Sequence, residues 1–236
     1  MAELILDGHL EYTLDEYEHL LESLLQRGYE FTDFSSPASD GQLLLRHDVD
    51  LCPQAALEMA RIEARYDVES TYCFLVSSPA YNLLDVENAT ALDEILALGH
   101  EVALHFDTHQ YWTNEPPLDA LRSAVLAECD TLSRLVDRQI HLVSFHQPPE
   151  WVLDVDFDGF VNTYQPAFFS AITYRSDSNQ KWRSEPPLRG ERPDRLQLLV
   201  HPGLWAPSAR RMAQIVEERS ADRREHVNDY FEALGA

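Results

Sequence analysis

Short apolar runs alternate with amphipathic stretches along most of the chain, and this alternation limits the possible folds more than any other feature. Strands are predicted at residues 43–50, 70–76, 101–106, 140–146, 159–164 and 196–201. Helices are predicted at residues 13–27, directly after Pro53, at 88–98, at 118–136, and from about 206 to 234. Strands that alternate with helices run parallel and are joined by right-handed crossovers. We therefore predict an α/β fold whose six or seven strands form a closed or nearly closed barrel.

The composition indicates one folded domain with an acidic surface. No repeat, linker or low-complexity segment divides the 236 residues, so we expect one domain over residues 1–236, and 44% hydrophobic residues suffice for its core. The net charge of −23 should repel nucleic acids and anionic membranes, and also anionic substrates unless the pocket is locally basic. Lys181 is the only lysine, and excess acid with almost no lysine favours a high-salt cytosol. A GC-rich genome would explain the arginines but not the many acids.

The cysteines and the N-terminal residues suggest a cytoplasmic protein. Cys52, Cys73 and Cys129 are odd in number and widely spaced, which argues against a disulfide framework and for a reducing compartment. Acidic residues interrupt every apolar run near the N-terminus, so no signal peptide is expected there. No stretch approaches the roughly 18 apolar residues of a membrane span.

Four predicted strands end in side chains that could perform catalysis. These are Asp48 and Asp50, His105, His146, and His201. Because the carboxyl ends of parallel strands meet on one face of the fold, these side chains should lie together. The sequence therefore predicts a functional site at this face.

Asp48 and Asp50 stand two residues apart, and in an extended strand both would point the same way. Two carboxylates so close raise one pKa unless a cation lies beside them. A metal ion on Asp50 would let Asp48 stay ionised as a general base. The alternative is a solvated turn in which either residue caps the following helix.

His105 and His109 are four residues apart, a spacing that on a helical turn places both rings on one face. In isolation such a pair is more often two ordinary surface or core histidines. Together with Asp50 it predicts a site for one divalent ion, zinc first, with open positions for water and substrate. Iron, cobalt, nickel or manganese would also suit this set of ligands.

Other polar residues are candidates for proton transfer and substrate binding. His201, on the last predicted strand, could be a general acid or a structural histidine. His146 could bind substrate, support a ligand, or be structural. Asp177 and Trp182 belong to a polar turn followed by an aromatic residue, which could form a sugar-stacking wall or a capped loop.

Taken in order, the segments LLLRHDVD, GHEVALHFDTH and LLVHP resemble the motifs of the polysaccharide deacetylase (NodB-homology) family. The similarity runs from about residue 42 to 205, with helical additions at both ends. It implies a distorted barrel of seven strands. It also implies Asp48 as the base, Asp50, His105 and His109 as metal ligands, and His201 as the general acid.

The same resemblance suggests further roles. Asp177 and Trp182 match a region that supports the site and forms its wall, and Arg46 or Arg175 could replace an arginine that the family places near the base. Proteins with HDVD are often associated with surface-glycan genes, so the expected substrate is a carbohydrate or glycan precursor. The expected activity is metal-dependent N-deacetylation. The alternatives are an amidase or deformylase acting on a small non-sugar molecule, and a non-catalytic metal- or glycan-binding protein.

Overall fold

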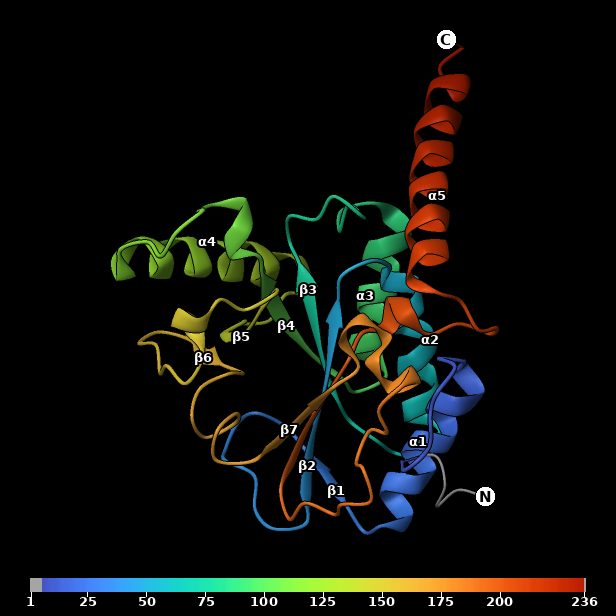
Figure 1. Cartoon of the computed structure of the whole chain (residues 1–236). Helices are drawn as coiled ribbons and strands as arrows, with labels where there is room; N and C mark the ends of the chain where they lie inside the picture. Colours follow the sequence, from blue (N-terminus) through green and yellow to red (C-terminus); the bar gives the residue numbers. More distant parts are fainter. Residues whose placement is uncertain (1–5, 236) are drawn as a thin grey trace.

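A computed structural model describes residues 6–235, and the remaining residues of the predicted 1–236 domain lie outside this description. Its centre is a sheet in which all strand pairs are parallel (Figure 1). The strands are β1 (Glu30–Thr32), β2 (Gln42–Val49), β3 (Thr71–Leu75), β4 (Glu101–Phe106), β5 (Leu142–Phe145), β6 (Val161–Asn162), β7 (Thr173–Ser176) and β8 (Leu196–Val200). Seven of them follow the order β6-β5-β4-β3-β2-β8-β7, and β1 pairs with β2. This curled sheet confirms the predicted α/β fold of the distorted barrel type.

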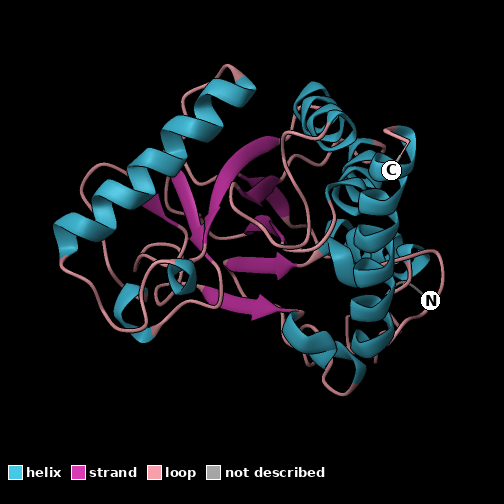
Figure 2. Cartoon of the chain, turned by 90° about the horizontal axis from the view of Figure 1, so that it is seen from above, coloured by secondary structure: helices cyan, strands magenta, loops and turns pink. Residues whose placement is uncertain are grey.

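Within residues 6–235, five α-helices lie outside the sheet. They are α1 (Leu14–Gln26), α2 (Pro53–Ala64), α3 (Val86–Ala97), α4 (Leu118–Val136) and α5 (Met212–Ala233). As Figures 1 and 2 show, α4 lies on one side of the sheet and the other helices gather on the opposite side. No helix within residues 6–235 is long and apolar enough to cross a membrane.

Local sequence explains where the first two helices begin. Thr13 caps α1 because its hydroxyl accepts a hydrogen bond from the Glu16 backbone, and the Glu16 carboxylate accepts one from the Thr13 backbone. Helix α2 begins at Pro53, whose missing N–H would have no partner in a first turn. These two helices pack against each other and against β2, the strand that leads into the predicted site.

The strand β2 carries alternate side chains to opposite faces of the sheet. Arg46 and Asp48 point into the barrel, where Arg46 reaches Gln197 on β8. His47, between them, points outward and contacts Glu63 of α2. Every residue of β2 after the first is buried, as expected for a strand covered on both faces. The period of two residues thus decides which side chains of this segment can reach the site.

Two strands, β1 and β7, were not predicted, and β6 is much shorter than predicted. Residues 159–164 were expected as a strand, but only Val161–Asn162 pair with β5. Strands β6 and β7 lie at the two ends of the seven-strand order, so each has a neighbour on one side only. A shorter ladder and partial exposure weaken the apolar pattern on which the prediction depends.

Candidate active site

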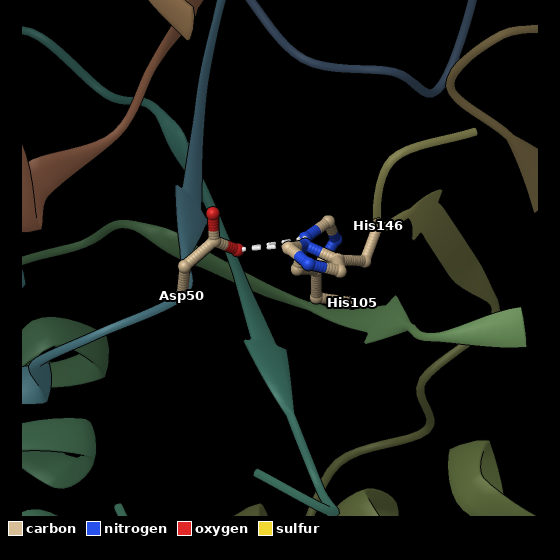
Figure 3. Close-up of side chains that lie close together, drawn as sticks. All are labelled: Asp50, His105 and His146. Carbon is tan, nitrogen blue, oxygen red and sulfur yellow. Dashed lines mark hydrogen bonds and ion pairs between the residues drawn. The ribbon is translucent and has the colours of Figure 1, made fainter. Parts of the chain in front are cut away.

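Three side chains able to bind a metal converge where β2, β4 and β5 end (Figure 3). The Asp50 Oδ1 atom lies 3.0 Å from His105 Nε2 and 3.1 Å from His146 Nδ1. The two ring nitrogens are 3.2 Å apart. One carboxylate oxygen and two imidazole nitrogens this close together form a donor set that fits one divalent transition-metal ion.

The strand register explains why His105 and His146 meet. His105 on β4 is opposite Ser144 on β5, and the backbone N–H of His146 donates to the carbonyl of Phe106 at 2.9 Å. The Nδ1 atom of His105 lies 3.1 Å from the Ser144 carbonyl, which can only accept a hydrogen bond. The His105 ring can donate to this carbonyl through Nδ1, and its Nε2 faces the Asp50 carboxylate, where it would bind a metal ion as a neutral imidazole.

The electrostatics of these groups favour a cation. Burial raises the pKa of Asp50, but hydrogen bonds from His105 and His146 and the nearby His201 hold it well below its ordinary value. Burial lowers the pKa of His146, while the Asp50 carboxylate raises it to a greater extent. In the metal-free protein a proton on His146 is thus stabilised where a metal ion would take its place.

His109, the predicted third ligand, lies away from this cluster, and His146 occupies the third position instead. Strand β4 continues through Phe106, and a short turn over Thr108–Gln110 follows it. Asp107 caps that turn and accepts from both the backbone N–H and the ring Nδ1 of His109, at 3.0 and 3.1 Å. The His109 side chain is 55% exposed. The helical face that the spacing suggested does not form, because His105 itself belongs to the strand.

Asp48, the predicted base, borders the same cleft and is 3% exposed. Its Oδ1 lies 3.2 Å from Arg46 Nε, and Ser144 Oγ donates to its Oδ2 at 3.0 Å. Burial raises the pKa of Asp48, but Arg46, His105 and His201 together hold it below its ordinary value. Asp48 is therefore ionised at neutral pH and can accept a proton.

Arg46 contacts Asp48 and not the cleft surface, which differs from its predicted role as a substrate binder. Its guanidinium donates to Thr163 Oγ1, Gln197 Oε1 and Tyr164 Oη at 2.6 to 2.7 Å, and the side chain has no exposed surface. An arginine buried in this way cannot touch a bound molecule. It fixes the orientation and charge of the carboxylate beside it.

His201 also borders the cluster, with its Nε2 atom 3.9 Å from Asp50 Oδ2. Asp177 accepts hydrogen bonds from the His201 ring Nδ1 at 2.5 Å, from the His201 backbone, and from Trp205 Nε1 at 2.9 Å. Although burial lowers the pKa of His201, the Asp177 carboxylate raises it to about 9. The ring is thus protonated at neutral pH and its free nitrogen faces the cluster.

Two residues predicted to contact substrate lie beneath the cleft. Asp177 is fully buried and holds His201. Trp182 is 1% exposed and packs against Tyr12 and Trp205 in the core next to α1. Its indole therefore supports the loop that carries Asp177 and offers no wall for a sugar ring.

The cleft has a volume of about 720 Å³ and includes residues that the motifs did not indicate. Gln147, directly after His146, and Asn179 line it, and both have positive φ angles, 41° and 57°. Such conformations are uncommon for residues other than glycine and are concentrated at functional sites. No pattern in the sequence marks them, because this backbone geometry depends on the surrounding fold.

Comparison with known proteins gives matches among solved structures only. No protein-family model matches the chain, and no curated protein does. A family 4 carbohydrate esterase from Bacillus anthracis is 14% identical, with 88% of this chain and 86% of that one covered and a TM-score of 0.48. A peptidoglycan deacetylase from Bacillus subtilis is 14% identical, with 85% and 96% covered and a TM-score of 0.44.

A Streptococcus pyogenes deacetylase is 17% identical, with 54% of this chain covered and a TM-score of 0.40, and the match spans 61% of that protein's length. A family 4 pseudoenzyme from Bacillus anthracis is also among the matches. At these identities and TM-scores the similarity assigns no activity to the chain.

Proposed function

We propose that this protein is a metal-dependent hydrolase that removes an N-acyl group, acetyl in the first instance, from a carbohydrate or glycan precursor. One observation carries the proposal. A buried ionised carboxylate, Asp48, and a protonated histidine, His201, border the same cleft as the metal-binding cluster. Amide hydrolysis needs such a pair, because one group must take a proton from water and another must give one to the leaving nitrogen.

The metal centre would consist of Asp50, His105 and His146. A divalent ion bound there would polarise the acyl oxygen and make water a better nucleophile near neutral pH. Zinc is our first choice because it accepts two imidazoles and one carboxylate with a position left open. Iron, cobalt, nickel and manganese accept the same ligands.

Asp48 and His201 then divide the proton transfers. Asp48 takes the proton of the attacking water, and Arg46 keeps the carboxylate ionised and oriented. His201, held by Asp177, donates its Nε2 proton to the nitrogen as the C–N bond breaks. The products are a free carboxylic acid and an amine, so the step balances without a further reactant.

The cleft and its buried pairs distinguish this function from the alternatives. A volume of about 720 Å³ is in the range of pockets that hold drug-sized ligands, larger than a small amide requires. A protein that only binds metal or glycan would need neither the Arg46–Asp48 pair nor the His201–Asp177 pair, each of which places charge inside the fold.

The decisive experiment combines metal analysis with acetate and formate release from a panel of N-acylated sugars and sugar nucleotides. It is run at low salt and in molar KCl, because the acidic composition suggests a high-salt cytosol. Asp48→Asn should keep the metal and lose at least a hundredfold in kcat, within the range typical of a general base. Metal bound without release from any substrate would refute the hydrolase.

A matched pair of variants tests the ligand set. His146→Gln should lower the metal content strongly, because it removes one of three donors. His109→Gln should retain the metal, since that ring is exposed and bonded to Asp107. Metal loss in His109→Gln with retention in His146→Gln would restore the ligand set predicted from the motif.

A further inference from the structure

A second hollow lies beside the active-site cleft and shares part of its wall. Its volume is about 550 Å³, and Leu51, Pro79 and Ala80 line both spaces. One face of α5 forms the opposite wall, with Val216 and Val227 contributing apolar surface. In Figure 1, α5 rises away from the body of the molecule, so this wall leads outward from the site. We call this space the α5 groove.

The α5 groove is basic on a protein that is otherwise strongly acidic. Arg219, Arg223 and Arg224 line it, and no carboxylate within residues 6–235 does, although the chain has a net charge of −23. Arg219 pairs with Asp222 at 3.1 Å and Arg223 is 3.5 Å from Asp85, whereas Arg224 has no ion pair in the described part of the chain. The groove therefore has positive charge available for a ligand.

The positions of the arginines along α5 fix their distances from the active-site cleft. Met212, at the start of α5, borders the active-site cleft. With a rise of 1.5 Å per residue, Arg219 lies about 10 Å and Arg224 about 18 Å further along the helix axis. In a molecule that occupied both spaces, the anionic groups would therefore belong to a part of the molecule other than the sugar that reacts in the cleft.

We propose that the α5 groove binds the anionic portion, phosphate or carboxylate, of the same carbohydrate whose N-acyl group enters the cleft. The inference rests on the proposed function and narrows its substrate to an anionic glycan or a sugar phosphate. Guanidinium groups bind phosphate and carboxylate through paired N–H donors, and apolar walls strengthen this attraction by limiting water. Because the rest of the surface repels anions, a local basic groove also selects where such a substrate docks.

Three probes and three variants test the proposal. The probes are a neutral chitotetraose with N-acetyl groups, a hyaluronan tetrasaccharide that carries carboxylates, and UDP-N-acetylglucosamine, which carries a diphosphate. The metal-loaded proteins are the wild type, Arg219→Gln, Arg224→Gln and the control Arg189→Gln. Arg189 is also exposed, pairs with Glu185, and lines neither of the two spaces. Calorimetry gives Kd, and acetate release gives kcat and KM.

The wild type should bind at least one anionic probe about tenfold more tightly than the neutral one. Arg219→Gln and Arg224→Gln should each weaken that binding about five- to tenfold, with kcat unchanged and with less than a twofold effect on the neutral probe. Arg189→Gln should match the wild type. An effect confined to UDP-N-acetylglucosamine identifies phosphate as the anion, and one confined to hyaluronan identifies carboxylate.

The inference and the proposed function fail in different ways. Equal affinity for neutral and anionic probes, or unchanged binding in both groove variants, would overturn the inference while acetate release still supported the hydrolase. Arginine-dependent binding without acetate release from any probe would support the anion site and count against the hydrolase.

Discussion

Glu63 joins helix α2 to the strand that carries the HDVD segment, and its replacement by glutamine should destabilise the protein while leaving the cleft intact. The carboxylate is fully buried, 2.6 Å from the His47 ring nitrogen Nε2. It accepts hydrogen bonds from the hydroxyls of Ser70 at 2.6 Å, Tyr72 at 2.9 Å, and Tyr17. Burial raises the pKa of Glu63, but His47 and the hydrogen bonds hold it below its ordinary value.

The size of the effect follows from these four contacts. A hydrogen bond to a charged group contributes about 1.5 to 3 kcal/mol, and a neutral one about 0.5 to 1.5 kcal/mol. Replacing Glu63 by glutamine keeps the shape, removes the charge and turns one acceptor oxygen into an NH2 donor, so the four contacts weaken by about 1 kcal/mol each on average. The free energy of unfolding should fall by about 4 kcal/mol. With a urea m-value of about 3 kcal/mol/M, the midpoint moves by about 1.3 M.

Urea denaturation at pH 7, followed by circular dichroism and fluorescence, measures this change. The control is Glu94→Gln, because Glu94 is 46% exposed and its ion pair with Arg61 should contribute under about 1 kcal/mol. Metal content should not change in either variant. A loss below 1 kcal/mol in Glu63→Gln would refute the reasoning that this buried carboxylate holds α2 to β2.

The difference in unfolding free energy between the wild type and Glu63→Gln should change with pH in a definite direction. A carboxylate whose folded pKa is lowered stabilises the protein above its unfolded pKa, here near 4.5. This contribution is lost as the pH falls from that value through the folded pKa. The gap between the wild type and Glu63→Gln should therefore be full at pH 7 and shrink below about pH 4.5.

Three further changes test the site. Asp177→Asn removes the main group that raises the pKa of His201 to about 9, so the alkaline limb of the pH profile of kcat/KM should move down by at least one pH unit. If this limb did not move, His201 would be excluded as the general acid. Arg46→Met removes the main group that opposes the effect of burial on the Asp48 pKa, so the pKa of this proposed base rises and activity at pH 6 should fall more than at pH 8. Gly203→Ala should reduce stability by about 1 to 3 kcal/mol on thermal denaturation, because the added methyl group would meet a neighbouring side chain at 2.8 Å.

The sequence was sufficient to predict the order of the main elements because their apolar patterns are strong. Buried strands such as β3 and β8 and amphipathic helices such as α1 and α4 were predicted near their observed positions. The strand β1 was not predicted because its three residues are too few to show a pattern of apolar residues. Its pairing with the beginning of β2 depends on the tertiary structure, and the local sequence does not indicate it.

The sequence predicts those parts of the site that lie at the carboxyl ends of the parallel strands. Convergence brought Asp50, His105, His146 and His201 to one cleft, as expected for parallel strands. The cluster in the structure contains His146 and not His109, which the spacing of four residues had placed on one helical face with His105. That inference requires the backbone to be helical from the first histidine onward, and here the first histidine is still in a strand.

The alternation of side chains along β2 places Arg46 beside Asp48, a pairing that the HDVD motif itself does not include. In a parallel sheet covered on both faces, a charged side chain inside a strand has to find a partner, because burying it alone would be too unfavourable. Residues two apart on a strand share a face, so the run RHD already places the guanidinium beside the carboxylate and directs His47 to the opposite side. The same rule gives His47 its own partner on α2, Glu63. The run RHD thus forms two buried pairs, an inner one of Arg46 with the proposed base Asp48 and an outer one of His47 with Glu63 that anchors the strand. Mutations of the outer pair should therefore act on stability before they act on catalysis.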